Sequence, residues 1–269
     1  MGKERLDKIV VARGLAESRE KAQALIMAGE VCVDGQVHLK PGTSFAPADI
    51  EVTVKSDPLP YVSRGGLKLE KALAAFAVDV TGKECLDVGA STGGFTDCLL
   101  QHGACRVIAV DVGYGQLAWS LRSDPRVVVL EKTNIRYLQL EGLPFRPQLI
   151  TVDTSFISVT KFLEVLVDFL PETGEIICLV KPQFEAGPAQ VGKGGIVRDP
   201  QVLKSVLQEH LLFGTNLGLG CSGLTFSPIK GTKGNIEFLA YWQKGLAGIP
   251  ASEWEEMIES VVTTAQLGL

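Results

Sequence analysis

Four charged side chains have the types and positions that a proton transfer or a developing negative charge would require: Lys68, Asp153, Lys181 and Glu237. Asp153 follows the apolar run 149-LITV, and Lys181 follows 176-IICLV. Strands of a buried parallel sheet are near-continuous apolar runs, so a charge that ends such a run is expected to face the crevice at the carboxyl edge of the sheet. A solvated strand end is the alternative for Asp153 and Lys181, and it has more weight for Lys68 and Glu237, whose segments are less diagnostic.

A glycine-rich loop, 87-DVGASTGGF, follows the first predicted strand of the larger region. Its glycines let the backbone approach a ligand closely at the start of a helix. The loop lacks the second glycine of the GxGxxG dinucleotide fingerprint and the GKS or GKT of a phosphate loop. Asp111 ends the next strand, where a carboxylate can accept hydrogen bonds from both hydroxyls of a ribose.

This pattern indicates an adenosine-containing cofactor, and the missing glycine favours S-adenosylmethionine over NAD because a sulfonium cofactor has no pyrophosphate. Asn134, just after the third strand, is the candidate for the adenine, with an ordinary loop asparagine as the equal alternative. The predicted cofactor-binding residues are Asp87, Gly89, Ser91, Gly93, Gly94, Phe95, Asp111 and Asn134.

The larger region alternates apolar strands with helices, which is typical of a doubly wound α/β sheet covered on both faces. Strands are predicted at 84–88, 106–110, 126–130, 148–152 and 175–180, and helices near 95–102, 115–121, 158–170 and 200–212. No helix fits between 220–228 and 235–242, so these segments are predicted to form an antiparallel pair at one edge. The fold class is therefore α/β and Rossmann-like, with a mostly parallel sheet and an antiparallel edge.

The first sixty residues form a separate pattern. Apolar residues at helical spacing predict two short amphipathic helices, and 30-EVCVDGQVHL predicts a hairpin that turns at Asp34-Gly35. A further extended piece is expected at 50–54. We predict a small α+β domain over residues 1–58, a linker over 59–63 and the α/β domain over 64–269.

The composition of the 269 residues excludes several classes of protein. The net charge is −5 and the pI is near 5.4, so the chain is not a globally basic nucleic-acid binder, although a local basic face is compatible with it. Six cysteines without a CxxC pair and three scattered histidines predict neither a disulfide framework nor a metal site. The apolar runs are too short to span a bilayer, and the charged N-terminus does not resemble a secretory signal, so a cytoplasmic protein is expected.

The N-terminal stretch LDKIVVARGLAESREKAQALIMAGEVCVDG resembles the S4-type RNA-binding domain first described in a ribosomal protein. Lys68, Asp153, Lys181 and Glu237 match the K-D-K-E tetrad of the FtsJ-like RNA 2′-O-ribose methyltransferases. The segments SRGGLKL, LDVGASTGGFT, DTSFIS, LVKPQFE and KGNIEF all resemble those of the TlyA family, bacterial rRNA 2′-O-methyltransferases also called hemolysins. The resemblance covers nearly the whole chain.

The resemblance implies a methyltransferase that uses S-adenosylmethionine to modify cytidine 2′-hydroxyls in large-subunit rRNA, and in some members also in small-subunit rRNA. It implies that Lys181 contacts the 2′-oxygen, either accepting its proton or stabilising the alkoxide, while Lys68, Asp153 and Glu237 complete the site. By the same resemblance, Arg5, Lys8, Arg13, Arg19, Lys21 and Arg64 are the candidate RNA-binding residues. Three alternatives remain: a non-catalytic ribosome assembly factor, a membrane-active hemolysin and an NAD-dependent oxidoreductase.

Overall fold

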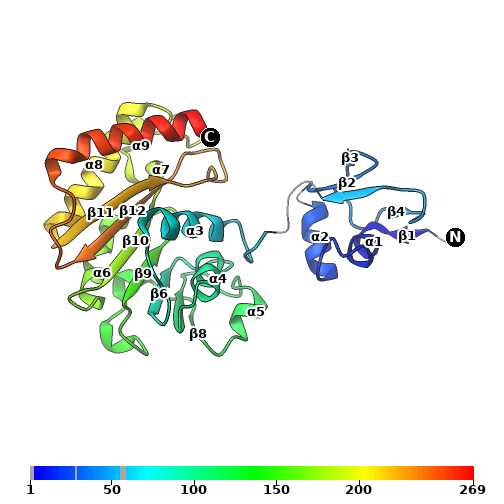
Figure 1. Ribbon diagram of the computed structural model, residues 1–269, viewed down its shortest axis with the longest axis horizontal. Helices are drawn as coiled ribbons and strands as arrows, with labels where there is room; N and C mark the ends of the chain where they lie inside the picture. Colours follow the sequence, from blue (N-terminus) through cyan, green and yellow to red (C-terminus); the bar gives the residue numbers. More distant parts are fainter. Residues whose placement is uncertain (1–2, 28, 55–58) are drawn as a thin grey trace. The chain divides into compact units, whose positions relative to one another are not determined.

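The computed structural model describes residues 3–27, 29–54 and 59–269, which divide into two compact units (Figure 1). Unit 1 is Met1–Pro60 and unit 2 is Tyr61–Leu269. The predicted domain boundary at residue 58 lies outside the described residues. Residues 61–63, predicted to belong to a linker, are part of unit 2. Tyr61 is buried there, and its hydroxyl donates to Glu70 Oε1 at 2.9 Å.

Unit 1 packs two helices against short strands. Its elements are β1 Glu4–Arg5, α1 Leu6–Ala12, α2 Arg19–Met27, β2 Val31–Val33, β3 Gln36–Val37, β4 Ser44–Phe45 and β5 Val52–Val54. The strands pair in the order β3-β2-β5, and β1 pairs separately with β4. Leu6 and Ile9 of α1 pack with Ile26 of α2 in a buried core. The β1–β4 pair was not predicted, because two-residue strands are too short to show an alternating pattern.

Unit 2 is built on a seven-stranded sheet with the order β11-β12-β10-β9-β6-β7-β8. The strands are β6 Glu84–Val88, β7 Arg106–Val110, β8 Val127–Leu130, β9 Leu149–Val152, β10 Glu175–Val180, β11 Leu219–Phe226 and β12 Phe238–Lys244. The strands from β6 to β10 run parallel, whereas β12 is antiparallel to both β10 and β11. The predicted fold class, with its antiparallel edge, is confirmed.

Helices cover both faces of this sheet (Figure 1). They are α3 Gly65–Phe76, α4 Gly94–Gln101, α5 Trp119–Arg122, α6 Leu163–Phe169, α7 Pro182–Glu185, α8 Pro200–Asn216 and α9 Trp254–Gly268. Short 3-10 helices are η1 Ile135–Tyr137, η2 Leu140–Gly142, η3 Val159–Lys161, η4 Pro188–Gln190 and η5 Ala251–Glu253. One buried cluster contains residues of α3 and α4, and the other contains residues of α6, α8 and α9. The helix predicted near 115–121 is shorter than expected and occupies only the four residues of α5.

The order of the strands reverses at β6, which pairs with β7 on one side and with β9 on the other. In open α/β sheets, ligands bind in the crevice at such a switch point. Here the carboxyl ends of β6 and β9 approach closely: a Cβ atom at Gly89 would lie 2.5 Å from the carbonyl oxygen of Asp153. Gly89 also has a φ of +87°. The close approach and the backbone conformation both require glycine at this position.

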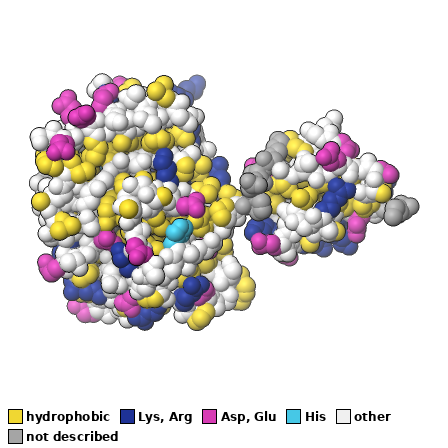
Figure 2. All heavy atoms as spheres, viewed as in Figure 1, with side chains coloured by type: hydrophobic (Ala, Val, Ile, Leu, Met, Phe, Trp, Pro, Cys, Tyr) yellow, Lys and Arg dark blue, Asp and Glu magenta, His cyan; other side chains and the backbone are white. Residues whose placement is uncertain are grey.

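The surface of unit 2 carries interspersed acidic and basic side chains on the face seen in Figure 2, without one broad basic patch. No helix in the described part of the chain is long and apolar enough to cross a membrane.

Candidate active site

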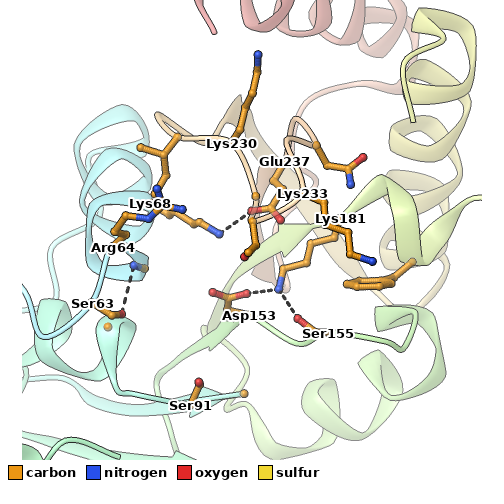
Figure 3. Close-up of a pocket in the computed structure, with 18 of the residues that line it drawn as sticks. Ser63, Arg64, Lys68, Ser91, Asp153, Ser155, Lys181, Lys230, Lys233 and Glu237 are labelled. Carbon is orange, nitrogen blue, oxygen red and sulfur yellow. Dashed lines mark hydrogen bonds and ion pairs between the residues drawn. The ribbon is translucent and has the colours of Figure 1, made fainter. Parts of the chain in front are cut away.

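The Lys181 side chain forms the centre of the site (Figure 3). Lys181 lies at the junction of β10 and α7, and Pro182 occupies the first position of α7, where a missing backbone N–H costs nothing. The Lys181 Nζ atom is 2.5 Å from Asp153 Oδ1 and donates to Ser155 Oγ at 3.0 Å. Lys181 is only 7% exposed, so its ammonium group depends on these two partners. The pairing joins the carboxyl ends of two adjacent parallel strands.

A second buried ion pair lies in the same cavity. Lys68, on the first turns of α3, is 2.6 Å from Glu237 Oε2, and the two side chains are 11% and 4% exposed. Glu237 immediately precedes β12. A Cβ atom at Gly231 would lie 2.4 Å from Glu237 Oε1, so glycine at 231 leaves room for the carboxylate. The structure therefore brings together all four residues predicted to be catalytic, as two ion pairs.

These pairs line a cavity of about 560 Å³ between α3, the 89–95 loop, α7 and the β11–β12 loop. Gln183 also lines it, and its buried Oε1 atom has no hydrogen-bond partner among the residues that the structure describes. A buried acceptor without a partner is costly, so this atom is available to a donor on a bound molecule.

A second cavity of about 480 Å³ adjoins the first and shares Gly89, Ser91, Asp153, Ser155 and Phe156 with it. Asp111 and Asn134 line only this second cavity, together with apolar residues such as Val110 and Ile135. Thr154 lines it too, and its buried Oγ1 atom has no hydrogen-bond partner within the described part of the chain. A mostly apolar cavity with a few polar groups suits an adenosine moiety, so the residues present fit the predicted cofactor. Within the described residues, no group of three or more His, Cys, Asp or Glu residues could hold a metal ion.

The predicted cofactor-binding residues divide into four groups by position: three groups line one or both cavities, and the fourth lines neither. Gly89 and Ser91 line both cavities, Asp111 and Asn134 line the second, and Gly94 and Phe95 line the first. The Asp111 carboxylate accepts hydrogen bonds from Ser91 N at 2.8 Å and from Gly113 N at 2.6 Å. Asn134 Oδ1 accepts from Arg136 N at 3.1 Å. These hydrogen bonds fix the Asp111 carboxylate and, at the same time, hold the glycine-rich loop through Ser91 N.

Gly93 and Asp87 line neither cavity. A Cβ atom at Gly93 would lie 2.3 Å from a methyl group of Leu121, so this glycine allows α5 to pack against the loop. Asp87 is fully buried and accepts hydrogen bonds from Thr96 Oγ1 at 2.6 Å and from Thr151 Oγ1 at 3.3 Å. These contacts give Asp87 a supporting position beneath the loop.

Burial raises the pKa of Asp87 to about 7, and the nearby Asp153 carboxylate acts in the same direction. A carboxyl group whose pKa is raised by folding contributes stability below its unfolded pKa, and this contribution is lost as the pH rises through the folded pKa. The wild type therefore loses this contribution as the pH rises, and Asp87→Asn does not. We expect the free energy of unfolding of Asp87→Asn, relative to that of the wild type, to increase by about 4 kcal/mol from about pH 4 to about pH 8. Urea unfolding of both proteins across this range measures the difference, and two parallel stability curves would contradict it.

The basic residues predicted in unit 1 make contacts within the unit. Asp7 is buried, and its carboxylate accepts hydrogen bonds from Arg5 at 2.9 and 3.0 Å and from Arg19 at 3.0 Å. These guanidinium groups, Arg5 first, hold the pKa of Asp7 well below its usual range. Arg13 donates to the carbonyl oxygens of Pro47 and Ile50 at 2.7 and 2.8 Å.

The remaining predicted RNA-binding residues are on exposed positions or in unit 2. Lys21 pairs with Glu17 at 3.1 Å, and Lys8 is exposed on α1. Arg64 precedes α3 and lines the cavity of the two ion pairs. Sequence reasoning missed Ser155 and Gln183, because a serine or a glutamine near a strand end carries no charge signal.

Comparisons with known proteins agree with this geometry. The profile of the FtsJ-like methyltransferases matches residues 61–244, and that of the S4 domain matches residues 4–50. The protein YqxC of Bacillus subtilis, provisionally named an rRNA methyltransferase, is 54% identical over 240 residues, which cover 89% of this chain and 85% of that one. The 16S/23S rRNA (cytidine-2′-O)-methyltransferase TlyA of Mycobacterium tuberculosis is 48% identical over 237 residues, 88% of each chain.

A solved structure from Streptococcus thermophilus, provisionally named a hemolysin, is 43% identical. It matches 100% of this chain and 97% of its own, with a TM-score of 0.78. The match to the methyltransferase profile spans more than half of the chain and includes all four residues of the two buried ion pairs. The chain therefore belongs to the FtsJ-like methyltransferase family, with an S4 domain in its N-terminal unit.

Proposed function

We propose that this protein transfers a methyl group from S-adenosylmethionine to the 2′-hydroxyl of a cytidine in ribosomal RNA of the large subunit, with small-subunit RNA as a second candidate substrate. The observation that carries the proposal is the Lys181–Asp153 pair at the junction of the two cavities, with Lys68–Glu237 beside it. The name of the relative from M. tuberculosis, a 16S/23S rRNA (cytidine-2′-O)-methyltransferase, supports the choice of base and of RNA. Its partners are ribosomal subunits, which places its action in the cytoplasm.

The larger cavity receives the target nucleotide, and the smaller one receives the nucleoside part of the cofactor. S-adenosylmethionine supplies a methyl group on a cationic sulfonium, whose carbon–sulfur bond breaks as the oxygen–carbon bond forms and the hydroxyl proton leaves. Lys181, fixed by Asp153 and Ser155, lies beside the 2′-oxygen. It either stabilises the developing negative charge, with the proton passing to solvent, or accepts the proton after losing one of its own.

Asp111 anchors the cofactor in this proposal. Its carboxylate accepts hydrogen bonds from the ribose hydroxyls and also holds the loop through Ser91 N. Removing a charge-assisted hydrogen bond costs about 1.5–3 kcal/mol. We expect Asp111→Ala to weaken cofactor binding about ten- to a hundredfold. Isothermal titration calorimetry measures this loss, and an unchanged Kd would remove Asp111 from the cofactor site.

Unit 1 provides RNA affinity in this proposal, through phosphate contacts of Arg5, Lys8, Arg13, Arg19 and Lys21, with Arg64 contributing from unit 2. The Arg5 and Arg19 side chains remain 43% and 47% exposed although both contact Asp7. Two guanidinium groups around one carboxylate leave a local excess of positive charge. Deleting residues 1–58 should leave cofactor binding intact and sharply weaken RNA binding. Full RNA affinity in the truncated protein would contradict this role.

Methyl transfer to isolated ribosomal subunits tests the function. Tritiated S-adenosylmethionine, incubated with the protein and unmodified subunits, should label the RNA, and Lys181→Ala should abolish the labelling. RNA binding without any methyl transfer by the wild type would contradict the proposed function and support a non-catalytic assembly factor.

A further inference from the structure

The side chains that line the cavity of the two ion pairs carry a net positive charge. Lys68 pairs with Glu237 and Lys181 pairs with Asp153, so these four charges cancel. The other charged residues that line this cavity are Arg64, Lys230 and Lys233, all of them basic. Within the part of the chain that the structure describes, no Asp or Glu side chain forms an ion pair with these three residues. A cavity with excess positive charge attracts anions, and RNA carries one on each phosphate.

Lys230 and Lys233 lie on the same loop between β11 and β12, but their side chains take different directions (Figure 3). Lys230 points away from the two ion pairs, and its Nζ atom donates to the carbonyl oxygen of Leu269 at 2.9 Å. Lys233 extends beside the 187–198 segment, where a Cβ atom added at Gly195 would lie 3.7 Å from the Lys233 Nζ atom. Of these two lysines, only Lys233 has an ammonium group without a hydrogen-bond partner among the described residues.

Asn235 fixes the Lys233 loop to that segment. Its Oδ1 atom accepts a hydrogen bond from Val197 N, and its Nδ2 atom donates to the Gly195 carbonyl oxygen, both at 2.9 Å. The Asn235 carbonyl oxygen accepts from Gly231 N, also at 2.9 Å. Asn235 is 2% exposed, so these bonds are shielded from water. This set of bonds, here called the Asn235 clamp, holds the backbone on both sides of Lys233.

Arg64 approaches the same cavity from the opposite wall, at the start of α3 (Figure 3). Its side chain forms no hydrogen bond or ion pair with another described residue. The catalytic pairs therefore lie between two unpartnered cations, one on each wall. A ribose inside an RNA strand has a negatively charged phosphate on each side, so its two phosphates can face the two cations.

We propose that Arg64 and Lys233 bind the two backbone phosphates that flank the target nucleotide, and that Asn235 is a positioning residue for Lys233. The substrate is then an internal nucleotide of an RNA strand, and a free nucleoside or mononucleotide lacks one or both contacts. This inference rests on the proposed function and identifies the part of the RNA that the site holds.

The test compares Lys233→Ala with Lys230→Ala, its matched control on the same loop. Single-turnover methyl transfer to unmodified ribosomal subunits is measured at several KCl concentrations, and the subunit concentration for half-maximal rate is determined at each. Lys233→Ala should raise this concentration about tenfold, and the slope of its logarithm against log[KCl] should fall by about 0.7, the value for one phosphate on a single strand. Lys230→Ala should change neither quantity, and cofactor affinity should stay constant in both variants.

Two further variants separate a charge contact from a structural effect. Lys233→Arg keeps the cation and should retain the wild-type slope. Asn235→Ala should reproduce the weaker binding of Lys233→Ala while its rate at saturating subunits remains near wild type. Its thermal unfolding temperature should fall, because Val197 N–H and the Gly195 carbonyl oxygen lose their partner. An active wild type together with equal salt slopes for Lys233→Ala and Lys230→Ala would overturn the inference. A wild type without methyl transfer would instead overturn the proposed function.

Discussion

Replacement of Lys181 by alanine is expected to slow methyl transfer about a hundred- to ten-thousandfold, the range for removal of a proton-transfer group or of a group that stabilises a developing oxyanion. The Lys181 ammonium is buried and held by Asp153 at 2.5 Å and by Ser155 at 3.0 Å, so its position in the site is fixed by two neighbours. Cofactor binding should remain close to wild type, because Lys181 does not line the cavity that contains Asp111 and Asn134. Single-turnover kinetics and calorimetry measure the two quantities.

The arginine variant distinguishes charge from geometry at this position. Lys181→Arg should not restore activity, because a planar guanidinium group cannot occupy the place of a compact ammonium and stays protonated. Substantial activity in Lys181→Ala would contradict the assignment of the whole site.

The second large effect is expected from the Lys68–Glu237 pair. Removal of one partner from a buried ion pair leaves an uncompensated charge and costs about 3–5 kcal/mol. Glu237→Leu should therefore destabilise unit 2 by this amount, since the Lys68 side chain is only 11% exposed. The double variant Lys68→Met with Glu237→Leu should recover most of the lost stability, because two apolar side chains fill the site without a charge. Neither protein should transfer methyl groups.

Urea unfolding followed by tryptophan fluorescence measures this effect, because the three tryptophans, Trp119, Trp242 and Trp254, all lie in unit 2. Glu259→Gln serves as the control, since it breaks the more exposed pair of Glu259 with Lys204 and should cost at most about 1 kcal/mol. Equal losses in Glu237→Leu and in the double variant would show that packing, and not the unpaired charge, dominates the cost.

The parallel part of the unit 2 sheet was predictable because most of its strands are apolar runs followed by a glycine loop or a single charged residue, although β6 contains the buried Asp87. Asp153 and Lys181 were found in the same way, because each is a charged residue directly after an apolar run, LITV or ICLV, where packing alone does not require a charge. The pairing of Lys68 with Glu237 was not predictable from spacing, because 169 positions separate them and only the topology brings them together. The resemblance to a known family supplied what the spacing lacked.

Other assignments depend on contacts that a sequence pattern does not encode. Asp87 and Gly93 belong to the glycine-rich motif, yet one forms hydrogen bonds beneath the loop and the other allows α5 to pack. From the sequence, Arg5 is expected to be a free surface cation, whereas in the structure its guanidinium forms an ion pair with the buried Asp7. The different directions of Lys230 and Lys233 are likewise set by a distant carbonyl and by the Asn235 clamp.

The chemical position of the transferred methyl group tests the central claim most directly. Unmodified ribosomal subunits are incubated with the protein and S-adenosylmethionine that carries a trideuterated methyl group, and the RNA is digested to nucleosides for mass spectrometry. We predict that the label appears in 2′-O-methylcytidine and that Lys181→Ala removes it. Label on a base, or the same 2′-O-methylcytidine signal from the Lys181→Ala protein, would contradict a ribose 2′-O-methyltransferase that works through these two ion pairs.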